Sequence, residues 1–202
     1  ISLGLVGSEM CIRDSPGTAR GWGSEGHAIV GEIAFGLLSK DERKRLGALI
    51  RTYRTPDGDY LRRFSKALAF PDRARHKADE PGASRRWRYF GRFDRWHFMN
   101  VPRDVSRVSR NYCARDCVLH AIDWHYERAR NRSLEAWKRA EAVIFLGHWV
   151  GDVHQPLHVS YADDRGGSVI DQIRGNFYAS AHLHSVWDTG IVRKAMKRRS
   201  IE

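Results

Sequence analysis

The amino-acid sequence predicts an all-α fold, and three observations indicate it. Apolar residues recur at the three- and four-residue spacing of amphipathic helices along most of the chain. Residues that favour helix ends, among them Ser39, Ser133 and Pro156, flank these stretches. There are no internal repeats, and no convincing run alternates apolar and polar residues as a half-buried strand does. A set of helices joined by loops is therefore expected.

The first two helices are predicted from apolar spacing and from a capping signal. Residues 26–38 carry Ile29 and Ile33 four positions apart, on one face of a helix. Ser39 is followed by Glu42, and this pair forms a capping box in which each side chain bonds the backbone amide of the other. A second helix is therefore expected to begin at this point.

Two further helices are predicted in the second half of the chain. Residues 117–130 have helical spacing, and the longest helix follows Ser133, which can cap it. That helix is expected to end before Pro156, because proline cannot continue a helix interior. Glycine, proline and aspartate predict loops at residues 55–59, 79–84 and 162–168.

The length and composition fit one globular domain with an excess of positive charge. The chain has 202 residues, of which 42% are hydrophobic, and this is enough for a substantial core. Its formal charge of +11 favours anionic partners such as nucleic acid, phosphate esters or an acidic membrane surface, although charge alone does not choose among them. No run approaches the roughly 18 apolar residues of a membrane span. We expect no stable membrane association and a monomer.

Residues 1–21 are expected to be a non-native or processed leader that precedes a domain at 22–202. This segment lacks a starting methionine and a basic beginning, and Glu9 interrupts its apolar part, so it is a poor secretion signal. Small residues, Ala19 and Gly21, nevertheless stand three and one positions before Trp22, as signal-peptidase cleavage prefers. A true signal peptide upstream of this point would make the protein secreted or periplasmic.

The cysteines leave two interpretations open. Cys113 and Cys117 either form a short local disulfide or are two reduced thiols one helical turn apart. The third cysteine, Cys11, falls within the expected leader and has no obvious partner.

The densest group of candidate metal ligands lies at the end of the predicted long helix. His148 and Asp152 are four residues apart, so their side chains share one helix face and can reach one cation. Pro156 ends the helix, and the chain beyond it can present His158 from another direction. A compact metal site needs ligands from several directions, so this stretch is predicted to hold metal.

Further candidate ligands stand elsewhere in the chain. His184 and Asp188 repeat the four-residue spacing, and Asp72, His97 and His27 add two imidazoles and a carboxylate. Each residue taken alone is more often an ordinary surface or core residue. Together they predict a cluster of divalent metals.

In order and spacing, these residues resemble the S1/P1 family of zinc-dependent single-strand nucleases and 3′-nucleotidases, whose fold is shared with bacterial zinc phospholipase C. The resemblance runs from Trp22 to about Asp188 and includes nine ligand positions. It implies a helical domain of the phospholipase C/P1 nuclease type with a trinuclear zinc site between helices. Three Zn²⁺ ions per chain are therefore expected.

The resemblance also divides the nine ligands among the three zincs. The sets are Asp72, His97, His148 and Asp152 for the first zinc; His158, His184 and Asp188 for the second; and Trp22, His27 and the bridging Asp152 for the third. In the family the mature chain begins at a tryptophan whose free amino group and carbonyl oxygen chelate zinc. Here that residue would be Trp22.

The implied chemistry is hydrolysis of a phosphodiester. Zinc lowers the pKa of a bound water from ~15.7 towards ~7, which gives hydroxide that attacks phosphorus in line. Asp72 and Asp152 would take part as catalytic ligands, and Arg75 matches the family's cation that stabilises the transition state. Stabilisation of the departing 3′-oxygen would leave products with 5′-phosphates.

Three residues are expected to bind the substrate. Phe98 matches the family's stacking residue, and stacking on an unpaired base is worth ~1–3 kcal/mol. Asn100 stands where fungal members carry an aspartate that reads the base edge, and Ser168 replaces the asparagine of a Gly-Gly-Asn motif. His182 also departs from the family pattern, and it is expected either to compete as a ligand or to point to solvent.

The leading hypothesis is a zinc-dependent nuclease and 3′-nucleotidase that acts on single-stranded DNA and RNA. Because family members continue well beyond Asp188, the domain at 22–202 is expected to be truncated at its C-terminus. One alternative is a phosphodiesterase similar to zinc phospholipase C. Asp188 rather than glutamate as the last ligand, and the short interval from Trp22 to His27, argue against it. The other alternative is a catalytically inactive, basic nucleic-acid-binding fragment.

Overall fold

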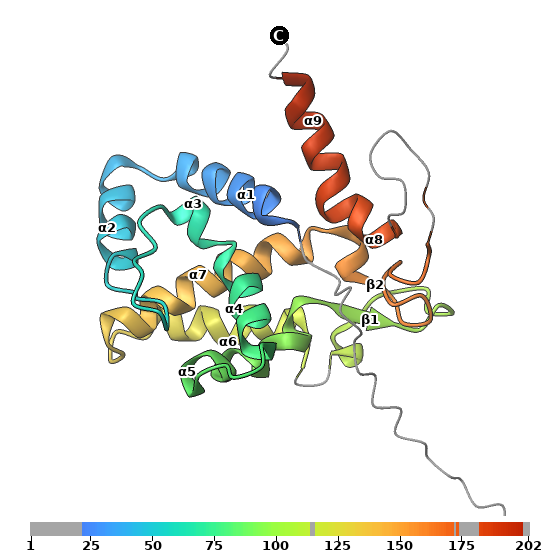
Figure 1. Ribbon diagram of the computed structural model, residues 1–202, viewed down its shortest axis with the longest axis horizontal. Coiled ribbons are helices and arrows are strands. Elements are labelled where there is room, and N and C mark those ends of the chain that lie inside the picture. Colours follow the sequence, from blue (N-terminus) through green and yellow to red (C-terminus); the bar gives the residue numbers. More distant parts are fainter. Residues whose placement is uncertain (1–21, 114–115, 172, 174–181, 200–202) are drawn as a thin grey trace, which may run out of the picture.

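The computed structural model describes residues 22–113, 116–171, 173 and 182–199. Helices predominate in this part of the chain, as the all-α prediction requires (Figure 1). The predicted leader, residues 1–21, lies outside the described residues. The domain boundary expected at Trp22 therefore stays a prediction.

The elements follow one another with short connections. In chain order they are α1 (Ser24–Leu37), α2 (Lys40–Ile50), α3 (Phe64–Ala67), α4 (Phe70–Asp79), α5 (Arg85–Arg88), η1 (Tyr89–His97), β1 (Met99–Val101), η2 (Arg110–Tyr112), α6 (Val118–Arg130), α7 (Ala136–Val153), η3 (Pro156–His158), β2 (Val159–Tyr161), α8 (Leu183–Ser185), η4 (Val186–Gly190) and α9 (Ile191–Arg199). η1 is a 3₁₀-helix, and η4 is a single turn of π-helix.

The capping box predicted for the second helix is present. The Ser39 side chain accepts a hydrogen bond from the Glu42 amide, and the Glu42 carboxylate accepts one from the Ser39 amide at 2.8 Å. The apolar face predicted for α1 has a different environment from the one its pattern suggests. Ile33 is 61% exposed and Leu37 is 83% exposed, so this face does not lie against the described core.

The two longest predicted helices of the second half form as α6 and α7, and these pack along each other (Figure 1). The predicted cap of α7 was wrong. Ser133 bonds instead to the Asn131 side chain, with its amide at 3.0 Å and its hydroxyl at 2.7 Å from Oδ1. This local turn provides the hydrogen-bond partner of Ser133, and α7 begins three residues later, at Ala136.

Two three-residue strands add a feature that the sequence pattern did not indicate. β1 and β2 pair in parallel, with Met99 opposite Val159 and Val101 opposite Tyr161. Each strand begins close after a candidate ligand: β1 begins two residues after His97, and β2 begins immediately after His158. The pairing therefore brings two distant histidines to the same place.

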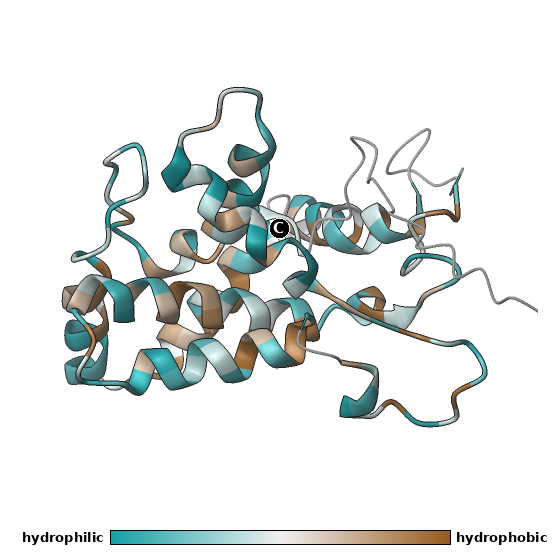
Figure 2. Ribbon diagram, turned by 90° about the horizontal axis from the view of Figure 1, so that it is seen from below, coloured by the Kyte–Doolittle hydropathy of each residue, from teal (hydrophilic) through white to brown (hydrophobic). Residues whose placement is uncertain are grey.

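The core beneath α7 is built from aromatic rings. Phe145 stacks on Phe90, with ring centroids 5.7 Å apart, and Phe70 meets Phe90 edge-on at 5.6 Å. Phe93 and Trp149 extend this cluster, and all five side chains are buried. Hydrophobic and hydrophilic bands alternate around the helices accordingly (Figure 2). Among the helices that the structure describes, none combines the length and apolar character that a membrane crossing requires.

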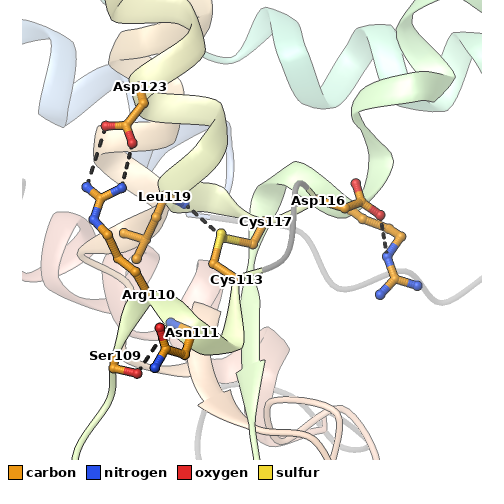
Figure 3. The surroundings of a disulfide bond; sticks show 9 residues. Ser109, Arg110, Asn111, Cys113, Asp116, Cys117, Leu119 and Asp123 are labelled. Carbon is orange, nitrogen blue, oxygen red and sulfur yellow. Dashed lines mark hydrogen bonds and ion pairs between the residues drawn. A yellow bond between two sulfur atoms is a disulfide. The ribbon is translucent and has the colours of Figure 1, made fainter.

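Cys113 and Cys117 form a disulfide, which decides between the two interpretations of these residues (Figure 3). Their Cα atoms are 5.5 Å apart, within the usual range. Cys117 also begins α6, since its sulfur accepts a hydrogen bond from the Leu119 amide at 3.3 Å. A nearby ion pair between Arg110 and Asp123 joins η2 to the same helix.

Candidate metal centre

Eight histidine and aspartate side chains from seven elements converge at one buried place. They are His27 of α1, Asp72 of α4, His97 of η1, His148 and Asp152 of α7, His158 of η3, His184 of α8 and Asp188 of η4. Every one of them is buried. Charged and imidazole groups rarely gather away from water unless they pair or bind a cation, so the gathering itself points to metal.

These side chains form three groups, each with ligand atoms within 4.8 Å of one another. The groups are His27, Asp72 and His148; His97, His148 and Asp152; and His158, His184 and Asp188. His148 belongs to the first two groups, so these two groups are adjacent. The third is the set predicted for the second zinc.

The pair on α7 forms the centre of this arrangement. His148 and Asp152 share one helix face, and Nε2 of His148 lies 3.1 Å from Oδ2 of Asp152. Nδ1 of His97 lies 3.1 Å from the same oxygen, whereas Nε2 of His27 lies 3.3 Å from Oδ1. The two oxygens of Asp152 therefore face different histidines, as a bridging carboxylate requires.

Backbone carbonyls orient three of the histidines. Nδ1 lies 2.6 Å from the carbonyl oxygen of Leu68 for His148, of His97 for His158 and of Gly166 for His184. A histidine that donates from Nδ1 in this way keeps Nε2 available as a metal ligand. The second nitrogen of each ring is thus directed into the cluster.

Gln155 supports the third group and was missed in the sequence. Its side chain is fully buried; Nε2 donates a hydrogen bond to Oδ1 of Asp188, and Oε1 accepts one from the Leu157 amide at 2.6 Å. Nε2 of His184 lies 3.3 Å from the other oxygen of Asp188. Its place between two candidate ligands, beside Pro156, was the one sequence signal that could have identified it.

The carboxylates of the cluster differ in their affinity for protons. Burial raises the pKa of Asp188 to about 9, despite the hydrogen bond from Gln155. Burial acts in the same direction on Asp152, but attraction to His148 and His158 outweighs it and holds that pKa well below its usual range. Burial and the charge of Arg75 lower the pKa of His97 to about 3. His97 is therefore a neutral imidazole at pH 7, the form that binds metal.

The residues present fit a cluster of divalent cations. Among the eight side chains of the cluster, four buried polar atoms lack a hydrogen-bond partner in the described part of the chain: Nδ1 and Nε2 of His27, Oδ1 of Asp72 and Oδ1 of Asp152. The ion-pair distance between His27 and Asp152 does not satisfy either atom, because its geometry is not that of a hydrogen bond. Unsatisfied buried acceptors are costly, and a cation coordinated by imidazole nitrogen and carboxylate oxygen would remove that cost.

Gly151 allows α1 and α7 to approach closely enough for this cluster. A Cβ atom at this position would lie 2.9 Å from Nδ1 of His27, closer than real contacts allow. The rings of His27 and His148 stack with centroids 3.8 Å apart, so His27 has little room to move. A glycine inside a long helix, where it is otherwise unfavourable, is the sequence signal of this close approach.

Comparison with known proteins assigns this chain to a family. The S1/P1 Nuclease family model matches residues 22–201. The chain belongs to the S1/P1 nuclease family. The described helices and the three buried histidine and aspartate groups agree with this membership.

Curated relatives agree with the family assignment. The chain is 30% identical over 192 residues to Endonuclease 2 of Arabidopsis thaliana, covering 87% of this chain and 57% of that protein. It is 38% identical over 79 residues to Nuclease P1 of Penicillium citrinum, covering 39% of this chain and 28% of that protein. It is 23% identical over 183 residues to Nuclease S1 of Aspergillus oryzae, covering 87% and 56%. The chain thus spans little more than half the length of the Arabidopsis relative.

The ninth ligand position of the S1/P1 nuclease pattern, Trp22, lies beside the cluster. The amide of its neighbour Gly23 donates to the backbone carbonyl of Asp188 at 2.7 Å. A Cβ at Gly26 would lie 2.7 Å from Cβ of Trp22, so the start of α1 packs closely against this residue. These contacts fix the chain next to Trp22 beside Asp188 and pack the Trp22 side chain against the first turn of α1.

Arg75, the predicted transition-state cation, is buried on α4 one helical turn after Asp72. Nη1 of Arg75 lies 3.6 Å from Oδ1 of Asp94. The charge of Arg75 also acts on the pKa values of Asp72 and His97. The guanidinium therefore lies close to the first group of ligands.

The three predicted substrate-binding residues are all partly exposed. Phe98 and Asn100 alternate with the buried Met99 and Val101, so both point away from the core on the opposite side of the strand, where they are partly exposed. Ser168 lies in the turn between His158 and His184, and its hydroxyl is buried without a hydrogen-bond partner among the described residues.

Two other histidines in the motifs have structural positions. His154 is exposed at the end of α7, and its Nδ1 lies 2.6 Å from the Val150 carbonyl oxygen. His182 begins α8, where Nδ1 accepts a hydrogen bond from the Ser185 amide at 3.1 Å. His182 is thus a helix cap, which was neither of the two roles expected for it.

Proposed function

We propose that this chain carries the catalytic centre of a zinc-dependent endonuclease. Its substrates would be single-stranded DNA and RNA, its products would carry 5′-phosphates, and it would also act as a 3′-nucleotidase. The observation that carries the proposal is the set of three buried histidine and aspartate groups, two of which share His148. Family membership supports zinc as the metal, and imidazole with carboxylate is a donor set that zinc binds readily.

Asp152 has the geometry of the central ligand. Its Oδ2 faces His97 and His148, each at 3.1 Å, and its Oδ1 faces His27 at 3.3 Å. Bound zinc ions would supply a water of lowered pKa and positive charge for the phosphodiester. Asp152 would hold two ions at a fixed separation, so the attacking and leaving oxygens would meet a preorganised site.

Arg75 would stabilise the charge that develops on the phosphoryl oxygens. It is buried, so its positive charge acts through a medium of low polarity, where electrostatic stabilisation is stronger than in water. Asp94 lies 3.6 Å from Nη1, which limits how the guanidinium can turn. A fixed cation next to the first ligand group is the arrangement that phosphoryl transfer needs.

Phe98 supports the preference for single strands. It is partly exposed, and it directly follows the candidate ligand His97. An unpaired base can stack on its ring for about 1–3 kcal/mol, whereas a base inside a duplex is already stacked and cannot reach it. Asn100 on the same face of β1 would contact the base edge, and Ser168 would border the same pocket.

Trp22 would complete the third site through its free amino group and carbonyl oxygen, together with His27 and Asp152. This requires cleavage before Trp22, because an amide nitrogen within the chain is not a metal ligand of this kind. The contact from Gly23 to Asp188 supports the placement. Forms that begin at Ile1 and at Trp22 should therefore differ strongly in activity, and equal activity would contradict this part of the proposal.

The experiment that tests the function is digestion of end-labelled oligonucleotides by zinc-loaded protein that begins at Trp22. We expect cleavage of single-stranded DNA and RNA to fragments with 5′-phosphates, phosphate release from 3′-nucleotides, and little cleavage of duplex. Release of phosphocholine from phosphatidylcholine without loss of single strands would overturn the proposal. Salt-sensitive binding of DNA with no cleavage at any zinc concentration would do so as well.

We also propose that the protein acts outside the reducing cytosol, as a secreted or periplasmic enzyme. The Cys113–Cys117 disulfide supports this, because such bonds persist in oxidising compartments. Alkylation and mass spectrometry of protein from its own cells provide the test. Two free thiols at these positions would count against this location.

A further inference from the structure

A pocket lies at the opposite end of α7 from the metal centre. It is a pocket of about 730 Å³, lined by residues of the loop after α2, helix α5, the end of α6 and the start of α7. Glu141 in its wall and Asp152 in the metal centre are eleven residues apart on one helix, which corresponds to about 16 Å along the axis. The pocket is therefore separate from the catalytic site described above.

The walls of this pocket are strongly basic. Six cationic side chains line it: Arg51, Arg54, Arg85, Arg86, Arg128 and Lys138. The lining includes one carboxyl group, that of Glu141, which is buried and shares a hydrogen bond with Tyr53. Burial raises the pKa of Glu141 to about 7, so its negative charge is only partial near neutral pH. The pocket therefore favours an anion.

Exposed aromatic rings stand among these cations. Tyr60, Tyr89 and Trp137 line the pocket and are 44%, 39% and 43% exposed. The Arg54 guanidinium lies 4.3 Å from the centre of the Tyr60 ring, and the Lys138 ammonium lies 5.2 Å from that of Trp137. Cationic groups interleaved with accessible rings suit a ligand that carries both a phosphate and a planar base.

We propose that this pocket binds a nucleotide unit outside the metal centre. Arg85 and its neighbouring arginines would contact the phosphate, and Trp137 would stack on the base. The choice of a nucleotide over other aromatic anions rests on the proposed nuclease function. The preference for an anion that carries a ring does not, because it follows from the lining residues alone. A strand with one segment in this pocket would be held about one helix length from the site of cleavage.

The chemistry distinguishes this ligand from simpler ones. Inorganic phosphate would use the guanidinium groups and leave the three exposed rings without a role. The uncharged form of Glu141 can donate a hydrogen bond to a base, and its charged form can accept one from an amino group. A base therefore finds stacking and edge contacts in the same pocket that neutralises its phosphate.

Photolabelling tests the proposal on zinc-loaded protein that begins at Trp22. The probe is 8-azidoadenosine 5′-monophosphate, which already has the 5′-phosphate of a reaction product. We expect adducts in peptides that contain Trp137 or residues 51–60 and 85–90. Arg85→Ala should weaken labelling of these peptides about tenfold, and Trp137→Ala about fivefold or more.

Arg107→Ala is the matched control, because Arg107 is an exposed arginine in the loop after β1 that does not line the pocket. It should leave labelling of the pocket peptides unchanged. Equal losses in the Arg85 and Arg107 variants, or adducts confined to peptides of the metal centre, would overturn the proposal. Competition by inorganic phosphate as effective as competition by AMP would show that no base is recognised, and would also overturn it.

A second arm identifies the source of the nucleotide. A thymidine oligonucleotide with phosphorothioate linkages competes against the probe. Competition about tenfold stronger than that of AMP would assign the pocket to a strand, and equal competition would assign it to a free nucleotide. Cleavage of labelled single-stranded DNA by wild type and by Asp152→Asn is measured in parallel. Pocket labelling without any cleavage would reject the proposed function and keep this inference.

Discussion

Gln155 donates a hydrogen bond from its side-chain amide to Asp188, and so joins the segment after α7 to the single π-helical turn η4. The two residues are 33 positions apart, and both are buried. Asp188 keeps its other oxygen 3.3 Å from His184. The hydrogen bond from Gln155 thus holds one oxygen of Asp188 and leaves the other facing His184.

Replacement of this amide should weaken the third group specifically. Gln155→Leu keeps similar bulk but removes the hydrogen bond, and supporting contacts of this kind typically change metal affinity by about 10–100-fold. We expect titration with a zinc chelator to release one ion per chain about 10–100-fold more readily than in wild type. The neighbouring exposed residue provides the control, since His154→Ala should retain the wild-type profile.

The close approach of α1 and α7 gives a second prediction. Gly151→Ala adds a Cβ 2.9 Å from Nδ1 of His27, so that ring must move away from the cluster. We expect loss of one bound zinc and at least a tenfold fall in cleavage, by analogy with displaced supporting groups. Gly36→Ala on α1 adds a methyl group into open space and should change neither quantity. Full zinc content in the Gly151 variant, measured by mass spectrometry, would show that His27 can shift without loss.

Removal of metal should also lower stability, because the cluster is buried and contains carboxylates that the ions would neutralise. An ion present at a thousand times its Kd contributes about 4 kcal/mol to folding. For a domain of this size that corresponds to a fall in Tm of about 10 °C per site on chelation. Calorimetry with and without EDTA measures it. An unchanged Tm would indicate that the folded chain binds no metal tightly.

Glu141 predicts a dependence of stability on pH. Its pKa is about 7 in the folded protein and near 4.5 in the unfolded chain, so the folded state binds more protons between these values. The contribution of Glu141 to the free energy of unfolding should therefore be fully present below about pH 4.5. It should be lost as the pH rises towards 7, which lowers stability by on the order of 3 kcal/mol.

Glu141→Gln should remove this dependence while it keeps a partner for Tyr53. Urea unfolding at pH 5 and pH 8 measures the difference. Glu127→Gln, at an exposed position of α6, is the control and should follow wild type. If stability depends on pH in the same way in the Glu141 and Glu127 variants, burial of Glu141 is not the cause of that dependence.

The disulfide gives a further prediction. A loop this short contributes about 2 kcal/mol through the entropy of the unfolded chain, so Cys113→Ser should lower Tm by about 4–8 °C. Zinc content should not change, because neither cysteine belongs to the ligand groups. Reducing agent should produce the same shift in wild type and no further shift in the variant. If reducing agent lowers Tm in both the wild type and the variant, the loss of stability does not come from this disulfide.

Local signals in the sequence predicted the helices and the spacing of the ligand pairs. The capping box of Ser39 and Glu42 is a short-range interaction, and His148 and Asp152 are one helical turn apart, so each can be read without knowledge of the fold. The family resemblance supplied the remaining positions, and the structure brings all eight histidine and aspartate side chains together.

What the sequence did not predict depends on contacts between distant segments. The role of Gln155 requires Asp188 to lie beside it, and that of Gly151 requires α1 to cross α7 at that point. Ser133 was assigned to a helix cap because its residue type favours caps, but Asn131 competes for the same hydrogen bonds. The exposed face at Leu37 shows that helical periodicity does not reveal which surface covers an apolar stripe.

The parallel pairing of β1 and β2 has a consequence for the order in which the protein assembles. It brings Nδ1 of His158 to the carbonyl of His97, across 61 residues, and the bond from His148 to Leu68 spans 80. Closing such long loops is slow and occurs late in folding. In the unfolded chain, only pairs such as His148 with Asp152 are near one another, and two ligands hold an ion weakly. Zinc should therefore enter a chain that has already folded, and refolding should proceed at the same rate whether zinc is added first or last.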